Sequence, residues 1–374
     1  MIKIMFMIHD LSHGGAEKVL VNLVNNMDPS KFDITVISLF AGGVNEKYLK
    51  SHIKYKTIFS KTFRGNSKVL QLLSPKQLHA LFVKDKFDIE VSYLEGPTAR
   101  IISGCQNKET KLVSWIHVQQ ENEKIASKAF RSYREAMKCY ARFNHTICVS
   151  ESVKKDFLNI FPKLNHVDVL YNTNETDLIL KKKDEEVREI QYDKNKKYLC
   201  GVGKIEPIKG FDKLARIHHR LICEGYPIVT CILGVGSDKD KIKQYIKDKK
   251  HQDTFLFLGY QDNPYKFVAN CDMFVCASTA EGFSTAATEA LIVGTPVVTT
   301  PVAGMEEMLG KNNEYGIITG PTEKELYLGI KSLLDSEEKM DHYKEQALIR
   351  GKRFSKKETV SAAETFFLEI LNCS

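Results

Sequence analysis

Glu281-Gly-Phe-Ser-Thr-Ala-Ala-Thr-Glu289 is the stretch from which the fold of this 374-residue chain can be worked out. It follows a short apolar run, residues 274–277, which is typical of a buried strand. The small residues after Thr285 predict a tightly packed helix that ends at Gly294. A strand, a loop and a helix in this order indicate an α/β fold with a parallel sheet, where ligands bind at the carboxyl ends of the strands.

The two glutamates of this stretch indicate what the ligand is. The amino terminus of the predicted helix favours an anion such as phosphate, because its backbone N–H groups are unpaired and its dipole is positive there. Most glutamates are solvent-exposed, but Glu289 stands among alanine, leucine and isoleucine, a context that predicts burial. Glu281 and Glu289 can therefore accept hydrogen bonds from the hydroxyls of a molecule that also carries phosphate. This combination suggests a sugar nucleotide.

The stretch resembles the glutamate-x7-glutamate motif of the retaining glycosyltransferases of the GT4 type, and Gly294-Thr-Pro-Val-Val and Gly304-Met-Glu-Glu continue the resemblance. The resemblance implies a GT-B fold, with two doubly wound Rossmann-like domains and a cleft between them. It also implies transfer of a hexosyl group from a nucleotide sugar, with a UDP-sugar as the first candidate, to an acceptor hydroxyl with retention of configuration. No metal and no cofactor beyond the donor substrate are expected. The alternatives are a nucleotide-sugar epimerase or hydrolase of the same fold, and a non-catalytic protein that binds a nucleotide sugar.

The length suits two domains with ample cores. We expect an acceptor-side Rossmann-like domain over residues 1–175 and a charged linker over residues 176–197. A nucleotide-sugar-binding Rossmann-like domain is expected over residues 198–354. In the resembled fold, a final helix over residues 355–374 crosses back to the first domain.

Charge is divided unevenly between the two halves. Residues 1–170 hold 25 Lys and Arg against 16 Asp and Glu, a net +9, whereas residues 171–374 hold 29 against 31, a net −2, giving the total of +7. This asymmetry is compatible with peripheral contact between the first domain and an anionic membrane, or with a merely solvated basic face. The chain has no nucleic-acid motif. We expect a glycan, lipid-linked or protein acceptor, as in the synthesis of capsule, exopolysaccharide or other cell-envelope polysaccharide.

The cysteines and the hydropathy favour a cytoplasmic protein, and the basic first half is compatible with a peripheral position on the inner face of the cell membrane. The nine cysteines form no CxxC pair and mostly lie in apolar runs, which is typical of reduced thiols. No apolar run is long enough for a signal-peptide core or a membrane span. Asp238-Lys-Asp240 has the form of a metal-binding motif, but it opens a basic helix and is better explained by the helix dipole.

Donor-binding residues are expected in three loops of the second half. Lys204 and Lys209 follow the predicted strand over residues 198–203 and are suited to hold a diphosphate. The family usually has arginine in place of Lys204, and lysine lacks its bidentate fork. The resemblance implies that Tyr260 belongs to a loop that holds the base, and that Glu281 acts on the sugar while Glu289 binds the ribose. The phosphates would contact the helix start at Phe283, Ser284 and Thr285.

The first half contributes two further candidates. Gly14 and Gly15 lie between a predicted strand over residues 3–9 and a helix, without the dinucleotide fingerprint. By itself this glycine pair favours a plain tight turn, because glycine is the default turn residue. His117 follows the predicted strand over residues 111–116, and an isolated histidine is more often structural. The resemblance implies that the glycine pair faces the donor and that His117 contacts the hexose, as a catalytic residue beside Glu281.

The remaining expectations concern local structure. We predict a strand over residues 32–40, a lysine-rich region of helices and loops over residues 44–86, and one long helix over residues 121–143. Ser150 is expected to cap the next helix.

Overall fold

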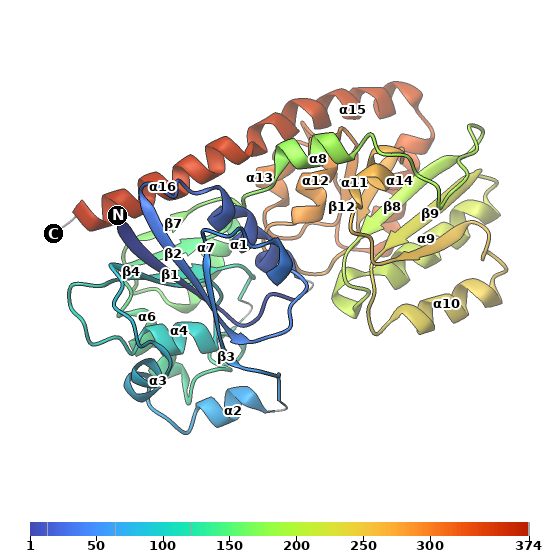
Figure 1. Cartoon of the computed structure of the whole chain (residues 1–374). Coiled ribbons are helices and arrows are strands. Elements are labelled where there is room, and N and C mark those ends of the chain that lie inside the picture. The colour runs from blue at the N-terminus through green and yellow to red at the C-terminus, as the bar shows by residue number, and fades with distance from the viewer. Residues whose placement is uncertain (13, 64, 121, 373–374) are drawn as a thin grey trace. The chain divides into compact units, whose positions relative to one another are not determined.

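A computed structural model describes residues 1–12, 14–63, 65–120 and 122–372 of the chain. The chain divides into two compact units, each built around its own parallel sheet (Figure 1). Unit 1 comprises Met1–Asn174 with Lys357–Ser374, and unit 2 comprises Glu175–Lys356. Two doubly wound sheets of this kind form the GT-B fold that the sequence predicts.

The sheet of unit 1 has seven parallel strands in the order β3-β2-β1-β4-β5-β6-β7. The order reverses between β1 and β4, and ligands bind at such a switch point in open α/β sheets. The strands are β1 (Ile2–Ile8), β2 (Phe32–Phe40), β3 (Lys54–Phe59), β4 (Ile89–Ser92), β5 (Lys111–Ile116), β6 (His145–Cys148) and β7 (Val167–Val169). The helices are α1 (Gly15–Asn26), η1 (Glu46–Tyr48), α2 (Asn66–Leu70), α3 (Pro75–Phe82), α4 (Pro97–Ile102), α5 (Glu123–Ala126), α6 (Tyr133–Tyr140), α7 (Glu151–Ile160) and α16 (Lys356–Asn372).

The sheet of unit 2 has six parallel strands in the order β10-β9-β8-β11-β12-β13, with its switch point between β8 and β11. The strands are β8 (Lys197–Val202), β9 (Ile228–Leu233), β10 (Phe255–Gly259), β11 (Met273–Cys276), β12 (Val297–Thr299) and β13 (Ile317–Ile318). The helices are α8 (Thr176–Lys182), η2 (Pro207–Lys209), α9 (Phe211–Cys223), α10 (Lys239–Asp248), α11 (Tyr265–Ala269), α12 (Thr285–Val293), α13 (Met305–Leu309), α14 (Glu323–Leu334), α15 (Glu337–Gly351) and η3 (Lys352–Phe354).

The last helix, α16, belongs to unit 1 although it comes from the end of the chain. Its Phe367 is fully buried and packs edge-on against Phe6 of β1, with a centroid separation of 5.7 Å. The ring of Trp115 on β5 also packs against Phe367, with a centroid separation of 6.5 Å. Burying an aromatic side chain contributes roughly 1.5–3 kcal/mol, so these contacts hold the carboxyl-terminal helix on the unit.

Two expectations for unit 1 are wrong. Residues 54–59 form the edge strand β3 within the lysine-rich region, because alternating Lys and apolar side chains suit a strand with one neighbour. The helix expected over residues 121–143 begins outside the described residues and is divided into α5 and α6. Ser132 interrupts it, since its hydroxyl caps α6 by accepting from the N–H of Glu135 at 3.2 Å.

The stretch expected as a linker, residues 176–197, begins with helix α8 and lies within unit 2. Ile179 on this helix is 1% exposed. The Nζ of Lys266 bonds to Glu189 at 3.0 Å, which ties the rest of the segment to α11. The segment is therefore packed against unit 2.

Candidate functional site

The carboxyl ends of β8 and β11 carry the two charged residues at the centre of the candidate site. These strands are neighbours in the sheet, so the loops that follow them lie side by side. The Nζ of Lys209 lies 2.6 Å from Oε1 of Glu281, and the hydroxyl of Ser278 donates to the same oxygen at 2.7 Å. Both side chains are largely buried, with 27% of Lys209 and 11% of Glu281 exposed. A charge-assisted bond in this setting holds the carboxylate in one orientation.

Gly210 allows the two loops to approach each other. Its φ of 65° lies in the left-handed region, and an added Cβ would meet the carbonyl oxygen of Ala277 at 2.2 Å. The N–H of Thr279 donates to the carbonyl of Ile208 at 2.8 Å and joins the loops through their backbones. Lys209 is therefore positioned against Glu281 by a backbone contact that only glycine permits.

Helix α12 begins beside this pair. Ser284 caps it by accepting from the N–H of Ala287 at 3.3 Å, and no acidic residue occupies its first turn. Gly294 ends the helix with a φ of 92°, as predicted. Glu289 is 7% exposed, which confirms its predicted burial. Phe283 is buried against Phe354, with ring centroids 5.9 Å apart, and this aromatic contact stabilises the segment just before the helix.

The other donor-binding candidates of unit 2 are more exposed. Lys204 lies in the loop after β8, and no carboxylate among the described residues is within ion-pair distance of it. Tyr260 follows β10 and is 47% exposed. Thr285, at the first position of α12, is half-buried. The structure thus brings Lys209, Glu281 and the start of α12 together, and leaves Lys204 in solvent.

In unit 1, the candidates lie at the ends of β1 and β5, on either side of the end of β4. Gly14 and Gly15 begin α1, and a Cβ on Gly14 would lie 1.7 Å from the carboxylate of Glu17. His117 directly follows β5, and its backbone N–H donates to Oε2 of Glu95 at 3.1 Å. Glu95 follows β4, so three adjacent strand ends supply these groups.

His117 is a neutral imidazole in a closed environment. It is 7% exposed, and burial lowers its pKa from 6.5 to about 3. Its ring lies 4.7 Å from that of Tyr93, while its Nε2 is buried and has no hydrogen-bond partner among the described residues. A buried polar atom without a partner costs about 1–3 kcal/mol, so Nε2 is suited to bond a ligand hydroxyl.

Sequence reasoning missed two residues of these sites. Ser278 orients Glu281, and Glu95 accepts from the backbone of His117. Burial raises the pKa of the Glu95 carboxyl above its ordinary value. Their position in the sequence could have identified them, because both residues stand in loops directly after buried strands.

Comparison with known families decides the identity of the fold. Two family descriptions match the chain: "Glycosyl transferases group 1" over residues 182–350 and "Glycosyltransferase Family 4" over residues 13–178. The chain belongs to this glycosyltransferase family. The two matches meet near the boundary between unit 1 and unit 2, and together they include most of the candidate residues in both units.

Several known proteins are similar to this GT4 chain. The N-acetylgalactosamine-N,N'-diacetylbacillosaminyl-diphospho-undecaprenol 4-alpha-N-acetylgalactosaminyltransferase of Campylobacter jejuni is 31% identical over 191 residues, covering 50% of each chain. Anabaena Alr3699/HepE, crystallised with UDP, superposes with a TM-score of 0.76 at 19% identity over 98% of this chain and 100% of that one. Staphylococcus aureus TarM gives a TM-score of 0.74 at 15% identity, covering 100% of both chains. The chain spans about half the length of the curated relatives that it matches, 50 to 59% in three of them.

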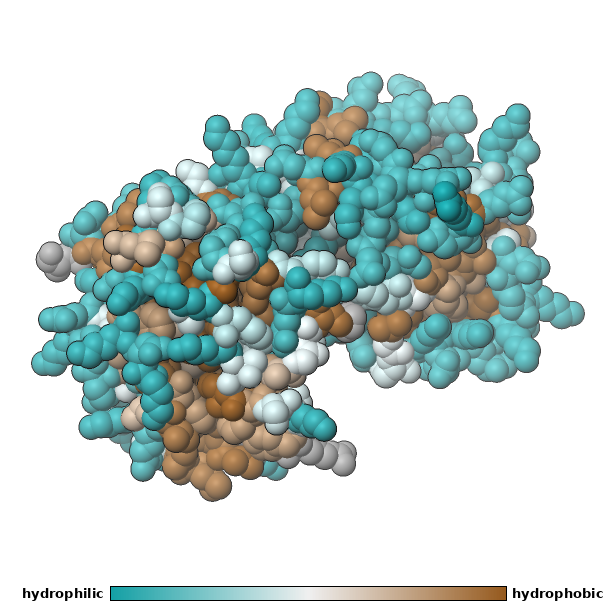
Figure 2. Space-filling model, in the orientation of Figure 1, coloured by the Kyte–Doolittle hydropathy of each residue, from teal (hydrophilic) through white to brown (hydrophobic). Residues whose placement is uncertain are grey.

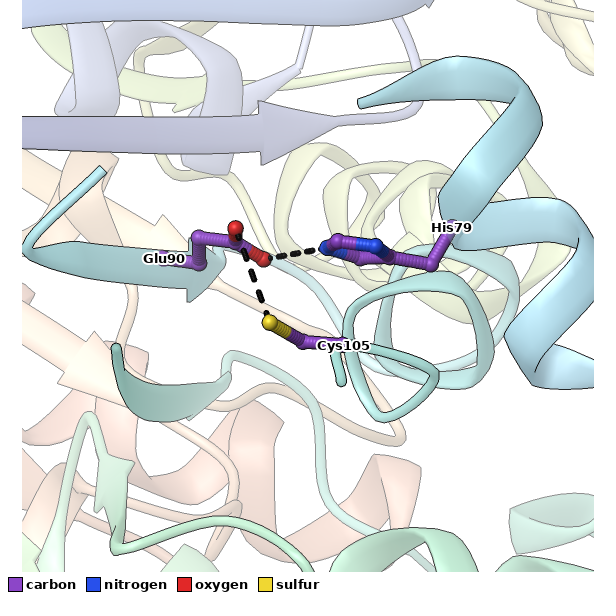
Figure 3. A group of neighbouring side chains, drawn as sticks. All are labelled: His79, Glu90 and Cys105. Carbon is purple, nitrogen blue, oxygen red and sulfur yellow. Dashed lines mark hydrogen bonds and ion pairs between the residues drawn. The ribbon is translucent and has the colours of Figure 1, made fainter. Parts of the chain in front are cut away.

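One further group of side chains in this GT4 chain has the composition of a metal site. His79 of α3, Glu90 of β4 and Cys105 after α4 place their ligand atoms within 4.8 Å of one another, the only such group among the described residues (Figure 3). However, Nε2 of His79 lies 2.7 Å from Oε2 of Glu90, whereas two ligands of one tetrahedral zinc ion lie roughly 3.3 Å apart. The distance is that of a direct hydrogen bond, so we interpret the group as a buried ion pair beside a thiol.

The His79–Glu90 pair makes the stability of unit 1 depend on pH. Burial opposes the charge of His79, but bonds to Cys105 and Glu90 outweigh it and raise its pKa from 6.5 to about 9. Because the pKa of His79 is higher in the folded state, the protonated histidine stabilises the fold fully below about pH 6.5. This contribution is lost as the pH rises through 9. We expect the free energy of unfolding in urea to fall by roughly 2–3 kcal/mol between pH 7 and pH 10. The double variant His79→Gln/Glu90→Gln should lose that pH dependence, and an unchanged slope would contradict the interpretation.

Proposed function

We propose that the chain is a retaining, metal-independent glycosyltransferase that moves a hexosyl group from a nucleotide sugar to an acceptor hydroxyl. The observation that carries the proposal is the Lys209–Glu281 pair beside the start of α12, in a chain of this family. A nucleotide sugar combines an anion with hydroxyl groups, and this site combines a cation, helix N–H groups and two carboxylates. UDP-sugars are the first donors to test, because the similarly folded HepE was crystallised with UDP and with UDP-glucose.

Lys209 has the bonding capacity for two partners at once. Its ammonium has three N–H donors, of which one is used by Glu281. Two remain for oxygens of a diphosphate, which the N–H groups at Phe283, Ser284 and Thr285 would also contact. Lys204, exposed in the same loop, would add a second positive charge. These groups stabilise the leaving diphosphate without a metal ion.

Glu281 and Glu289 take different parts in the proposed reaction. Glu281, which is bonded to Lys209, would support positive charge at the anomeric carbon, whereas the buried Glu289 would accept from ribose hydroxyls. Tyr260 would lie against the base. From unit 1, His117 would donate or accept at a sugar hydroxyl through its unpartnered Nε2, and Gly14 and Gly15 would let the backbone approach the donor. The leaving phosphate would itself take the acceptor proton, so no separate base is needed.

We further propose a lipid-linked glycan as the acceptor class, in cell-envelope glycan synthesis. The named activity of the Campylobacter relative is transfer to a saccharide carried on diphospho-undecaprenol. None of the described helices has the length and apolar composition of a membrane span. The eight described cysteines are free thiols, which supports our proposal of a cytoplasmic location.

A donor screen tests the proposed reaction. The purified protein is incubated with single UDP-, GDP- and ADP-sugars, with and without lipid-linked acceptors, and products are read by mass spectrometry. We expect nucleotide release that requires the acceptor, together with a gain of one hexosyl mass. Release without acceptor would indicate the hydrolase, an isomeric donor would indicate the epimerase, and donor binding without turnover would indicate a binding protein.

A further inference from the structure

Residues 68–73, which comprise the end of α2 and the turn that leads toward α3, have an unusual hydrogen-bond arrangement and are called the 68–73 turn. The carbonyls of Lys68 and Val69 accept from backbone N–H groups at 3.2 and 3.1 Å. The carbonyls of the next four residues all accept from two arginine side chains. Arg100 bonds to Leu70 and Leu73 at 2.8 and 2.7 Å, and Arg131 bonds to Gln71 and Leu72 at 2.6 and 2.8 Å.

One of the two arginines is buried, and the other, Arg131, is exposed at the surface. Arg100 is 1% exposed, and its guanidinium forms an ion pair with Glu135 at 3.1 Å. Its side chain is therefore fixed in the position from which it bonds to the turn. The side-chain amide of Gln71 also donates to the carbonyls of Lys128 and Phe130, each at 3.0 Å. Six successive carbonyls of the turn therefore need no water. A backbone segment can leave water only when its polar groups are paired in this way.

Three apolar side chains of the same region are exposed to solvent. Leu72 at the tip is 77% exposed, Val69 is 50% exposed, and Leu81 on α3 is 51% exposed. Figure 2 shows hydrophobic residues gathered over the part of unit 1 where α2 and α3 lie. Single exposed apolar residues are ordinary. Here three of them lie in one region, beside a turn whose backbone carbonyls are all hydrogen-bonded within the protein.

The sequence segment that contains the turn carries charge of one sign. Residues 47–84 contain no Asp or Glu and hold nine basic residues, eight of them lysines. Lys54 and Lys56 pair with acidic residues from outside this segment. Lys61, Lys68 and Lys76 are exposed and have no carboxylate within ion-pair distance among the described residues. An apolar tip flanked by unpaired lysines matches an anionic lipid surface, where each basic residue contributes about 1 kcal/mol.

We propose that this surface, the 68–73 turn with α3, docks on an anionic bilayer and inserts Leu72 and Val69 into its interface. Lys61, Lys68 and Lys76 contact the lipid headgroups. A protein partner would be expected to bring carboxylates or to pair with free backbone groups, and the turn offers no free carbonyl for such pairing. The inference deepens the proposed function and rests on it for its purpose, because a lipid-linked acceptor is reached at the membrane surface.

Flotation of the full chain with vesicles tests the surface without any substrate. We expect binding to vesicles of phosphatidylcholine with 30% phosphatidylglycerol at 0.1 M salt, and loss of binding at 0.5 M salt. Leu72→Ser should weaken the partition about tenfold. Lys68→Gln/Lys76→Gln should weaken it about thirtyfold, because each lysine contributes about 1 kcal/mol. The matched control is Leu328→Ser, since Leu328 is 49% exposed on α14 of unit 2 and its replacement should have no effect.

A spectroscopic variant locates the insertion. Trp115 is the single tryptophan and is 3% exposed, so it is insensitive to the outer surface. Leu72→Trp should shift its emission to shorter wavelength when anionic vesicles are added, whereas Leu328→Trp should not. Failure of the wild type to float, equal binding by Leu72→Ser, or a self-association that Leu72→Ser abolishes would each overturn the proposal. Donor turnover with a soluble acceptor is measured in parallel, so loss of the proposed activity is distinguished from loss of membrane binding.

Discussion

Replacing Glu281 by glutamine is expected to lower kcat for sugar transfer by about 10²- to 10³-fold, with a change in donor KM of less than about threefold. Glutamine keeps the size of the side chain and can still accept from Ser278, but it removes the negative charge beside the anomeric carbon. The charge acts mainly in the transition state, where positive charge develops on the sugar. Steady-state kinetics with the donor identified by the screen would measure both parameters.

Two variants accompany this measurement. Glu289→Gln should act in the opposite sense, raising donor KM about tenfold with a smaller effect on kcat, because a bond to a ribose hydroxyl is made in both ground and transition states. Glu338→Gln, at an exposed position of α15, should leave both parameters unchanged. If Glu281→Gln kept full activity while Glu289→Gln abolished it, the roles of the two glutamates would be assigned wrongly.

Replacing Lys209 by methionine is expected to lower kcat/KM for the donor by about 10²- to 10³-fold, or roughly 3–4 kcal/mol. Methionine fills similar space but removes the cation that is bonded to Glu281 at 2.6 Å. The variant loses the charge that would stabilise the leaving diphosphate. It also leaves a largely buried carboxylate that keeps the Ser278 hydroxyl and the more distant Cys276 thiol but has lost its cation. Calorimetric titration with UDP would show the lost affinity directly, without dependence on turnover.

Lys204 provides the comparison for this variant. It stands in the same loop but is exposed and has no ion-pair partner among the residues described. Lys204→Met should therefore weaken UDP binding by only about five- to tenfold and leave the melting temperature unchanged. The double variant Lys209→Met/Glu281→Gln should recover the stability, though not the activity, that Lys209→Met alone loses. Full UDP affinity in Lys209→Met at low ligand concentration would remove the diphosphate role.

Local sequence patterns predicted the elements whose structure depends on neighbouring residues. The strand over residues 32–40, the cap at Ser150 and the end of α12 at Gly294 all appear as expected. A hydroxyl cap, a glycine in the left-handed region and an apolar run each act within a few residues. The strand over residues 54–59 was not predicted, because an edge strand tolerates lysines that look typical of a loop. The prediction of one helix over residues 121–143 was wrong, because Ser132 caps a separate helix.

The sequence by itself determined the family motif, the two α/β units and the residues at the strand ends. Only the tertiary structure decided which of those residues meet. Lys209 bonds to Glu281 because β8 and β11 are neighbours in the sheet, although 72 residues separate the two side chains. Glu95 reaches His117 because β4 lies beside β5, and Arg100 reaches the 68–73 turn across the fold. Periodicity reports which face of an element is buried, whereas strand order, which long-range packing sets, determines which side chains share a site.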